Sequence, residues 1–122
     1  MLINELAKAT GVSRDSIRHY QELGLLEVEK QAAGSRNYNQ YPDVNVDRIE
    51  IIKMGKSMGF TLKEIASHID AYFSGQLTVD EQVKIFEDKL YAVHEKIREL
   101  EESKAYINQK IGRLKSEEIP TC

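Results

Sequence analysis

A long apolar repeat in the C-terminal part of the chain constrains its fold more than any other feature. From Val79 to Leu114, apolar residues alternate at spacings of four and three, the pattern of the a and d positions of a heptad repeat. Ten of these eleven positions are apolar, and the exception is Lys104 at an a position. A helix of this length would extend roughly 55 Å, and its narrow apolar strip cannot be buried by a small compact domain. The repeat therefore predicts a coiled coil between two chains.

The ten apolar residues of this repeat form the predicted dimer face. The helix that carries them is expected to start at a capping box, Thr78-Val79-Asp80-Glu81, and to give way to a short tail after Leu114. The chain is expected to break at Ser74-Gly75-Gln76, which gives a domain at 1–75, a dimerisation helix at 76–115 and a tail at 116–122. The dimer face consists of Val79, Val83, Phe86, Leu90, Val93, Ile97, Leu100, Ile107, Ile111 and Leu114.

The N-terminal residues predict two short helices joined by a turn. Apolar residues recur at helical spacing over Ile3–Ala7, and Gly11 interrupts them. Ser13 is a favourable N-cap for a second helix, which Gly24 stops. Two such helices make a helix-turn-helix candidate, a motif of modest specificity by itself.

A small β-hairpin is expected next. Residues 26–29 alternate between apolar and polar, residues 30–35 form a loop with a glycine, and Tyr38 and Tyr41 mark the returning stretch. A hairpin directly after a helix-turn-helix is usually described as a wing. A third helix is expected from Pro42 to about Met58.

A fourth helix has a clear start. Thr61 and Glu64 form a T-x-x-E capping box, and the apolar stripe that follows continues to Phe73.

The composition limits the function classes without selecting one. The chain has 122 residues, 41% of them apolar and 30% charged. No stretch approaches the roughly 20 apolar residues that span a bilayer, and the start lacks the features of a secretion signal. A single cysteine, Cys122, gives no disulfide framework, so a soluble cytoplasmic protein is expected. Residues 1–63 carry nine Lys and Arg against eight Asp and Glu, so charge alone supports nucleic-acid binding only weakly.

Spaced motifs along the chain carry a family resemblance. They are Ile3-Asn4-Glu5-Leu6-Ala7 with Gly11-Val12-Ser13, Ile17-Arg18-His19-Tyr20 with Gly24-Leu25-Leu26, the tyrosines Tyr38 and Tyr41, and Met58-Gly59-Phe60-Thr61-Leu62-Lys63-Glu64-Ile65. In this order, and followed by a coiled coil, they resemble the MerR family of bacterial transcription regulators. The match extends over essentially the whole chain and is far more specific than a lone helix-turn-helix.

The resemblance implies a mainly α fold: a winged helix-turn-helix DNA-binding domain with two wings, followed by a long dimerising coiled-coil helix. It implies a homodimer, paired through an antiparallel coiled coil, that binds a pseudo-palindrome in double-stranded promoter DNA with an overlong spacer. Regulators of this family bend and untwist the promoter, so RNA polymerase is an indirect partner. The signal to which the chain responds is unknown.

The predicted DNA contacts combine the resemblance with the chemistry of the residues. Arg14 and Arg18 are four residues apart on the second helix, and arginines so placed can reach guanine edges or phosphates in a major groove. The alternative is a solvated helix whose arginines pair with neighbouring acids. Tyrosine hydroxyls can donate to phosphates, or their rings can pack in the core. The full predicted set is Ser13, Arg14, Arg18, His19, Tyr20, Arg36, Tyr38, Tyr41 and Lys63, where Lys63 is either a phosphate contact at a helix N-terminus or a plain surface lysine.

Two positions depart from the family pattern. Asn39 stands where the family usually has an arginine, two residues before the second wing tyrosine. Arg36 could contact a phosphate in place of that arginine. His19 stands where the family usually has its first aromatic residue after Ile17 and Arg18, and it keeps a flat ring while adding a titratable group.

Other functions have less support from the residues. Thiolate sensing of soft metals needs at least two cysteines, and the three histidines show no ligand spacing, so neither a metal nor a cofactor is expected. No catalytic constellation is present, so an enzyme is not expected. The main alternative is an adaptor of the MerR fold that binds a partner protein instead of DNA, which the near-neutral N-terminal half and Asn39 keep open. Cys122 could be a redox switch or an inert tail residue.

Overall fold

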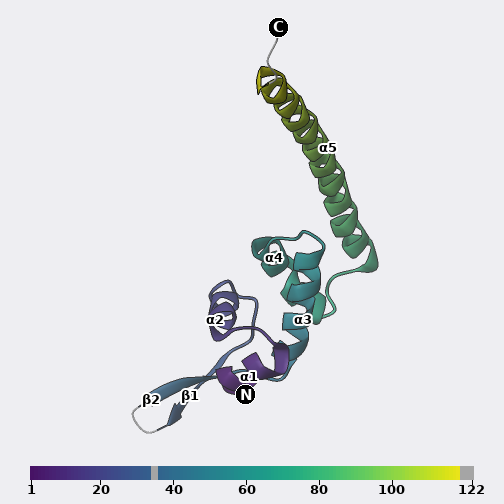
Figure 1. The fold of residues 1–122 in the computed structure, drawn as a ribbon. Helices are drawn as coiled ribbons and strands as arrows, with labels where there is room; N and C mark the ends of the chain where they lie inside the picture. The colour runs from purple at the N-terminus through teal and green to yellow at the C-terminus, as the bar shows by residue number, and fades with distance from the viewer. Residues whose placement is uncertain (34–35, 119–122) are drawn as a thin grey trace. The chain divides into compact units, whose positions relative to one another are not determined.

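The computed structural model describes the backbone of residues 1–33 and 36–118, and the side chains of residues 1–30 and 38–117. Cys122 and the side chain of Arg36 lie outside the described residues. The chain forms two compact units, Met1–Glu81 and the residues from Gln82 on. The described residues are mainly helical with one two-stranded sheet (Figure 1), which confirms the predicted fold class. The predicted domain limits stay a prediction.

The first unit opens with a helix-turn-helix, as predicted. Helix α1 (Ile3–Thr10) ends at Gly11, whose φ of 73° lies in the left-handed region that glycine adopts without strain. Helix α2 (Arg14–Glu22) starts at Ser13, whose Oγ accepts a 3.1 Å hydrogen bond from the backbone N–H of Ser16. The N-cap predicted at Ser13 is therefore confirmed.

The wing is a two-stranded antiparallel hairpin that extends away from the helices of this unit (Figure 1). Strand β1 (Glu29–Ala33) pairs with strand β2 (Arg36–Gln40). The predicted loop over 30–35 is wrong for residues 30–33, which belong to β1. The alternating residues before Glu29 are not in the strand, because the side chain of Asn45 bonds both the N–H and the C=O of Glu27, at 2.9 and 2.7 Å.

Helices α3 (Val44–Ser57) and α4 (Leu62–Phe73) complete the helical part of this unit, close to their predicted limits. The capping box of α4 is confirmed, since Glu64 N–H donates to Thr61 Oγ1 at 3.1 Å and Thr61 N–H donates to Glu64 Oε1 at 3.0 Å. The two helices approach closely at Gly55, where a Cβ atom would lie 2.8 Å from Cδ1 of Ile65. A glycine at this point therefore lets the backbone of α3 contact α4.

The core of the first unit draws on all four of its helices and on the segment after α2. Its buried apolar residues are Leu6, Ile17, Tyr20, Leu25, Leu26, Tyr41, Ile49, Ile52, Ile65 and Ile69. Backbone bonds also tie the start of α1 to the end of the wing. The N-terminal amino group of Met1 donates to the Tyr41 carbonyl at 2.9 Å, and Tyr41 N–H donates to the Met1 carbonyl at 2.7 Å.

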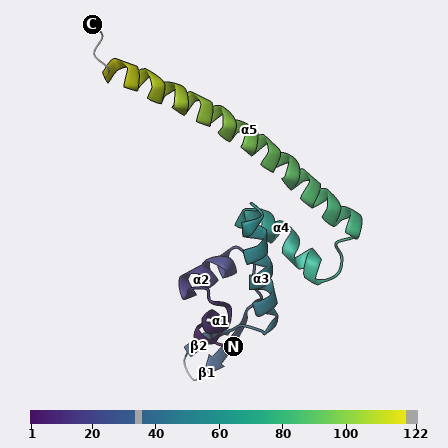
Figure 2. The same ribbon diagram turned by 45° about the vertical axis from the view of Figure 1, so that its right-hand side comes forward.

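Helix α5 (Val79–Glu118) is a single helix of 40 residues (Figure 2). Its predicted capping box is confirmed, because Glu81 N–H donates to Thr78 Oγ1 and Thr78 N–H donates to Glu81 Oε1, both at 3.1 Å. Helix α5 continues past the last residue of the apolar repeat and includes residues 115–118. The apolar repeat ends at Leu114, but the next residues are compatible with a helix, and the sequence has no helix breaker before Pro120. Among the described residues, no helix is long and apolar enough to cross a membrane.

Candidate nucleic-acid interface

The outward side of α2 carries two arginines that are held only by exposed partners. Arg14 Nη1 donates to Asn4 Oδ1 at 3.3 Å, and Arg18 Nη1 donates to Asp15 Oδ1 at 3.2 Å. The side chains of Arg18 and Asp15 are 57% and 96% exposed. Surface ion pairs of this kind contribute only about 0.2–1 kcal/mol. A phosphate or a base edge could therefore replace these partners at little cost.

The opposite side of α2 explains this orientation. Ile17 is fully buried and Tyr20 is nearly so, whereas His19 is exposed together with the two arginines. Burial of Ile17 fixes the rotation of the helix, and the basic side chains consequently point into solvent.

A cleft brings α2 and the wing together. It has a volume of about 270 Å³ and contains Arg18 together with Tyr38 and Asn39 of β2. Leu2, Ile3 and Asn4 at the start of α1 and Tyr41 complete its lining. Two residues that the sequence predicts separately, Arg18 and Tyr38, therefore border one concave surface. Tyr38 is 37% exposed, so part of its side chain is open to a ligand.

Three residues of the predicted DNA set have structural roles in this unit. Tyr41 is 1% exposed, and its hydroxyl donates to Gln21 Oε1 at 2.7 Å. Tyr20 is buried in the core cluster. Of the two alternatives for these tyrosines, core packing matches their burial. Ser13 is occupied as the N-cap of α2.

Lys63 lies apart from this cluster, in the first turn of α4, and its side chain is exposed. It follows directly on the capping box at Thr61, so it stands beside a helix N-terminus whose partial positive charge attracts anions.

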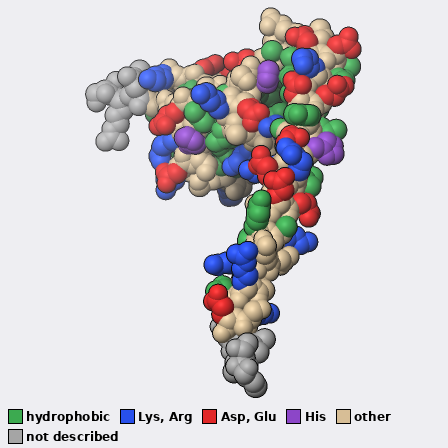
Figure 3. Space-filling model, turned by 90° about the horizontal axis from the view of Figure 1, so that it is seen from above, with side chains coloured by type: hydrophobic (Ala, Val, Ile, Leu, Met, Phe, Trp, Pro, Cys, Tyr) green, Lys and Arg blue, Asp and Glu red, His purple; other side chains and the backbone are tan. Residues whose placement is uncertain are grey.

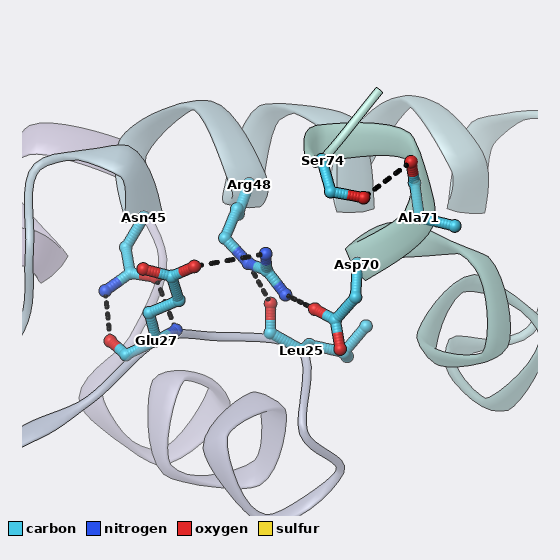
Figure 4. A network of polar contacts seen from close by, with 7 residues as sticks. All are labelled: Leu25, Glu27, Asn45, Arg48, Asp70, Ala71 and Ser74. Carbon is cyan, nitrogen blue, oxygen red and sulfur yellow. Dashed lines mark hydrogen bonds and ion pairs between the residues drawn. The ribbon is translucent and has the colours of Figure 1, made fainter. Parts of the chain in front are cut away.

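A buried polar network, which the sequence analysis missed, supports the segment that leads from α2 into the wing (Figure 4). Arg48 is only 2% exposed; its Nε donates to the Leu25 carbonyl at 2.7 Å and its Nη2 donates to Asp70 Oδ1 at 2.6 Å. Its Nη1 lies 4.0 Å from Glu27 Oε1. The helical spacing of Asn45 and Arg48 on the apolar side of α3 was the available signal, because it places both residues with Ile49 and Ile52.

The predicted dimer face of α5 is exposed on the single chain. The exposed fractions of its ten residues run from 37% at Val93 to 74% at Val79. Figure 3 shows apolar side chains at the surface of the long helix, among charged ones. An apolar strip of this kind on an otherwise charged helix is typical of a coiled-coil partner surface. Among the described residues, no group of three or more His, Cys, Asp and Glu side chains is placed to hold a metal.

Two family models together cover this arrangement of a helix-turn-helix, a wing and a long helix. The model described as the MerR HTH family of regulatory proteins matches residues 1–72, and the model described as MerR, DNA binding, matches residues 46–114. The chain belongs to the MerR family.

Several proteins are similar to this MerR-family chain. It is 45% identical over 64 residues to the mercuric resistance operon regulatory protein of Bacillus cereus, a match that covers 52% of this chain and 46% of that protein. It shares a fold with the transcription regulator PbrR691 from Ralstonia metallidurans CH34 in complex with lead(II), with a TM-score of 0.77 and 23% identity over 89% of this chain and 84% of that one. It also shares a fold with HiNmlR, a MerR family regulator lacking the sensor domain, bound to promoter DNA; the TM-score is 0.60, with 22% identity over 94% of this chain and 90% of that one.

Membership of the MerR family makes this protein a transcription regulator with a DNA-binding domain. Regulators of the family bind promoter DNA and act as dimers. The comparisons lend no support to a protein-binding adaptor, and the relatives are regulators rather than enzymes.

Proposed function

We propose that this chain regulates a promoter as a homodimer that binds a pseudo-palindromic operator through α2 and the wing and distorts the DNA in response to a signal. The observation that carries the proposal is the arginine pair of α2. Arg14 and Arg18 are exposed on a helix whose other side is fixed in the core, and Arg18 borders a cleft shared with Tyr38 of the wing.

In this proposal α2 enters the major groove. Arg14 and Arg18 contact base edges or phosphates, and His19 lies beside them on the same exposed surface. Tyr38 donates its hydroxyl to a phosphate on the side of the wing, and Lys63 contacts the backbone as part of a second wing. Phosphate contacts of this type set the register of the protein on DNA, whereas the arginines supply sequence readout.

Dimerisation through α5 provides the second DNA-binding domain, which binds the second half-site of the operator. Two copies paired through α5 in an antiparallel coiled coil carry two α2 helices related by a twofold axis, which fits an operator with pseudo-twofold symmetry. Such a dimer acts on RNA polymerase indirectly, by changing the shape of the promoter DNA.

Footprinting and binding titrations on the chain's own promoter test the proposal. The expected result is protection of a palindrome by a dimer, with an affinity that falls steeply as salt rises, because each phosphate contact releases a counterion. Arg18→Ala should weaken operator binding by about tenfold or more while leaving the dimer folded. Arg113→Ala, the same change on an exposed position of α5, is the matched control and should bind as the unmodified chain does. Equal binding by both variants would remove Arg18 from the interface, and salt-insensitive binding would contradict the proposal as a whole.

We further infer that the chain acts in the cytoplasm, where promoter DNA is found, and that it has no enzymatic activity of its own. A regulator of this kind needs only to bind two shapes of DNA with different affinities, and no residue of the proposed interface carries out a chemical step.

A further inference from the structure

The flanks of the dimer face hold charged residues that the single chain does not pair. In-chain ion pairs along α5 join Lys84 to Asp88, Arg98 to Glu95 and Lys96 to Glu99, at 3.4, 2.6 and 3.8 Å. These residues occupy b, c, f and g positions of the heptad. The e positions lie directly beside the dimer face, and five of them are ionisable residues that take part in no ion pair within the described part of the chain: Asp80, Glu87, His94, Glu101 and Lys115.

We propose that two α5 helices pair in one antiparallel register, in which Ile97 lies opposite Leu100 of the partner subunit. The inference rests on the proposed dimer and specifies how its two helices are aligned. It follows from three independent features of the helix: the extent of the dimer face, the position of Lys104, and the charges at the e positions.

The extent of the dimer face favours this register. In an antiparallel pair, each a position faces a d position of the other helix. Placing Ile97 opposite the partner's Leu100 also places Leu90 opposite the partner's Ile107 and Val83 opposite the partner's Leu114. Every a and d residue from Val83 to Leu114 then has a counterpart. A shift by one heptad leaves either Val83 or Leu114 beyond the end of the pairing, and that apolar surface stays in water.

Lys104 determines the orientation of the two helices. In a parallel dimer in register, each a position faces the same a position of the other copy, so Lys104 would meet the partner's Lys104 inside an apolar layer. In the antiparallel register it faces Val93 of the partner subunit instead. The two lysines are then roughly 16 Å apart along the helix axis, and each can extend its ammonium group to solvent.

Charge complementarity at the e positions favours the same register. In an antiparallel pair, e positions lie beside e positions of the other helix. The proposed register puts Asp80 beside Lys115 of the partner subunit and His94 beside Glu101 of the partner subunit, and symmetry produces each pair twice. One shift by a heptad pairs Glu87 with the partner's Lys115 but places Glu101 beside the partner's Glu101. The opposite shift places Glu87 beside the partner's Glu101 and forms no opposite-charge pair at the e positions. At the g positions, the proposed register places Lys89 beside the partner's Lys110, a like-charge contact that symmetry also produces twice.

Cysteine cross-linking between single variants tests the register directly. The background is the full chain with Cys122→Ser, so that no native thiol reacts. Ile97→Cys is mixed with one second variant, allowed to exchange subunits under reducing conditions, and then oxidised mildly. Disulfides need a Cα separation of about 4.4–6.8 Å, which facing a and d positions provide and positions a heptad apart do not.

The expected result is a covalent dimer in the mixture of Ile97→Cys with Leu100→Cys. Cross-linking of Ile97→Cys with Val93→Cys, or with Ile107→Cys, would overturn the register in favour of a shift by one heptad. Cross-linking of Ile97→Cys alone would overturn the orientation, because only a parallel pair brings the two copies of this residue together. A monomer in sedimentation experiments on the Cys122→Ser chain would overturn the proposed dimer itself.

A charge exchange gives a second test that leaves the dimer face intact. Lys115→Glu places two acids beside each other at both ends of the dimer, and it should raise the dimer dissociation constant by about fivefold to tenfold at low salt. Combining Lys115→Glu with Asp80→Lys restores opposite charges and should return the constant to within about twofold of the original. A double variant as weak as Lys115→Glu would overturn the pairing of these two positions.

Discussion

Arg48 on α3 donates a 2.6 Å hydrogen bond through Nη2 to Oδ1 of Asp70 on α4, and the two partners differ greatly in exposure. The Arg48 side chain is 2% exposed, whereas the Asp70 side chain is 79% exposed. The guanidinium also lies 5.3 Å from the centre of the Phe73 ring and donates to the Leu25 carbonyl. One buried cation thus joins two helices to the segment that leads from α2 into the wing (Figure 4).

This asymmetry predicts unequal costs for removing the two partners. Arg48→Met leaves the buried Leu25 carbonyl without its donor and should lower the free energy of unfolding by about 2–4 kcal/mol. Asp70→Ala leaves an arginine that keeps its other partners, while the lost carboxylate was mostly in water, so the cost should be about 1 kcal/mol. Urea unfolding at one fixed protein concentration measures both, because the stability of a dimer depends on concentration. Equal costs would show that Arg48 is not buried as described.

Asn45 should set the point at which the wing strand begins. Its side chain holds both backbone groups of Glu27, so Asn45→Ala should free them and speed hydrogen exchange at the Glu27 amide by about tenfold or more. Asn39→Ala, the same change on β2, is a control that leaves these two bonds in place. Unchanged exchange at Glu27 in Asn45→Ala would contradict the role assigned to Asn45.

The sequence predicted those features that depend on neighbouring residues. N-caps and capping boxes join residues three apart, and the heptad repeat needs no knowledge of the rest of the fold. The caps at Ser13, Thr61 and Thr78 can therefore be predicted from the sequence, and the structure confirms them.

Features that depend on distant partners were missed. Arg48 meets residues more than twenty positions away in the sequence, Leu25 and Asp70, and Asn45 meets Glu27 eighteen positions away. These contacts decide where β1 starts, and no local pattern in residues 26–33 reveals them. The same holds for Tyr41, whose burial depends on how α1 and α2 pack beside it.

The pKa of Glu81 should respond to the capping box of α5. The backbone N–H of Thr78, and then its side chain, lower this pKa below its ordinary value of 4.5. The ionised carboxylate therefore stabilises the first turn of α5 at pH values above 4.5. This stabilisation is lost as the pH falls through the lowered pKa of Glu81. Thr78→Val removes only the side-chain contribution, so the pKa of Glu81, followed by carbon NMR, should rise part of the way back. Thr61→Val makes the same change in the capping box of α4 and should leave the pKa of Glu81 where it was.

Restoring a basic residue to the wing should strengthen DNA binding. Asn39 lies on β2 and borders the cleft that contains Arg18 and Tyr38, so a side chain at this position lies beside the proposed DNA surface. Asn39→Arg adds one cation there. If it contacts a phosphate, affinity should rise about threefold to tenfold at low salt, and the slope of log affinity against log salt should steepen by about 0.9. Asn39→Gln lengthens the side chain without charge and should leave the slope unchanged. A gain in affinity without a steeper slope would mean that the arginine acts by a contact other than phosphate, and no gain at all would place this side of the wing away from the DNA.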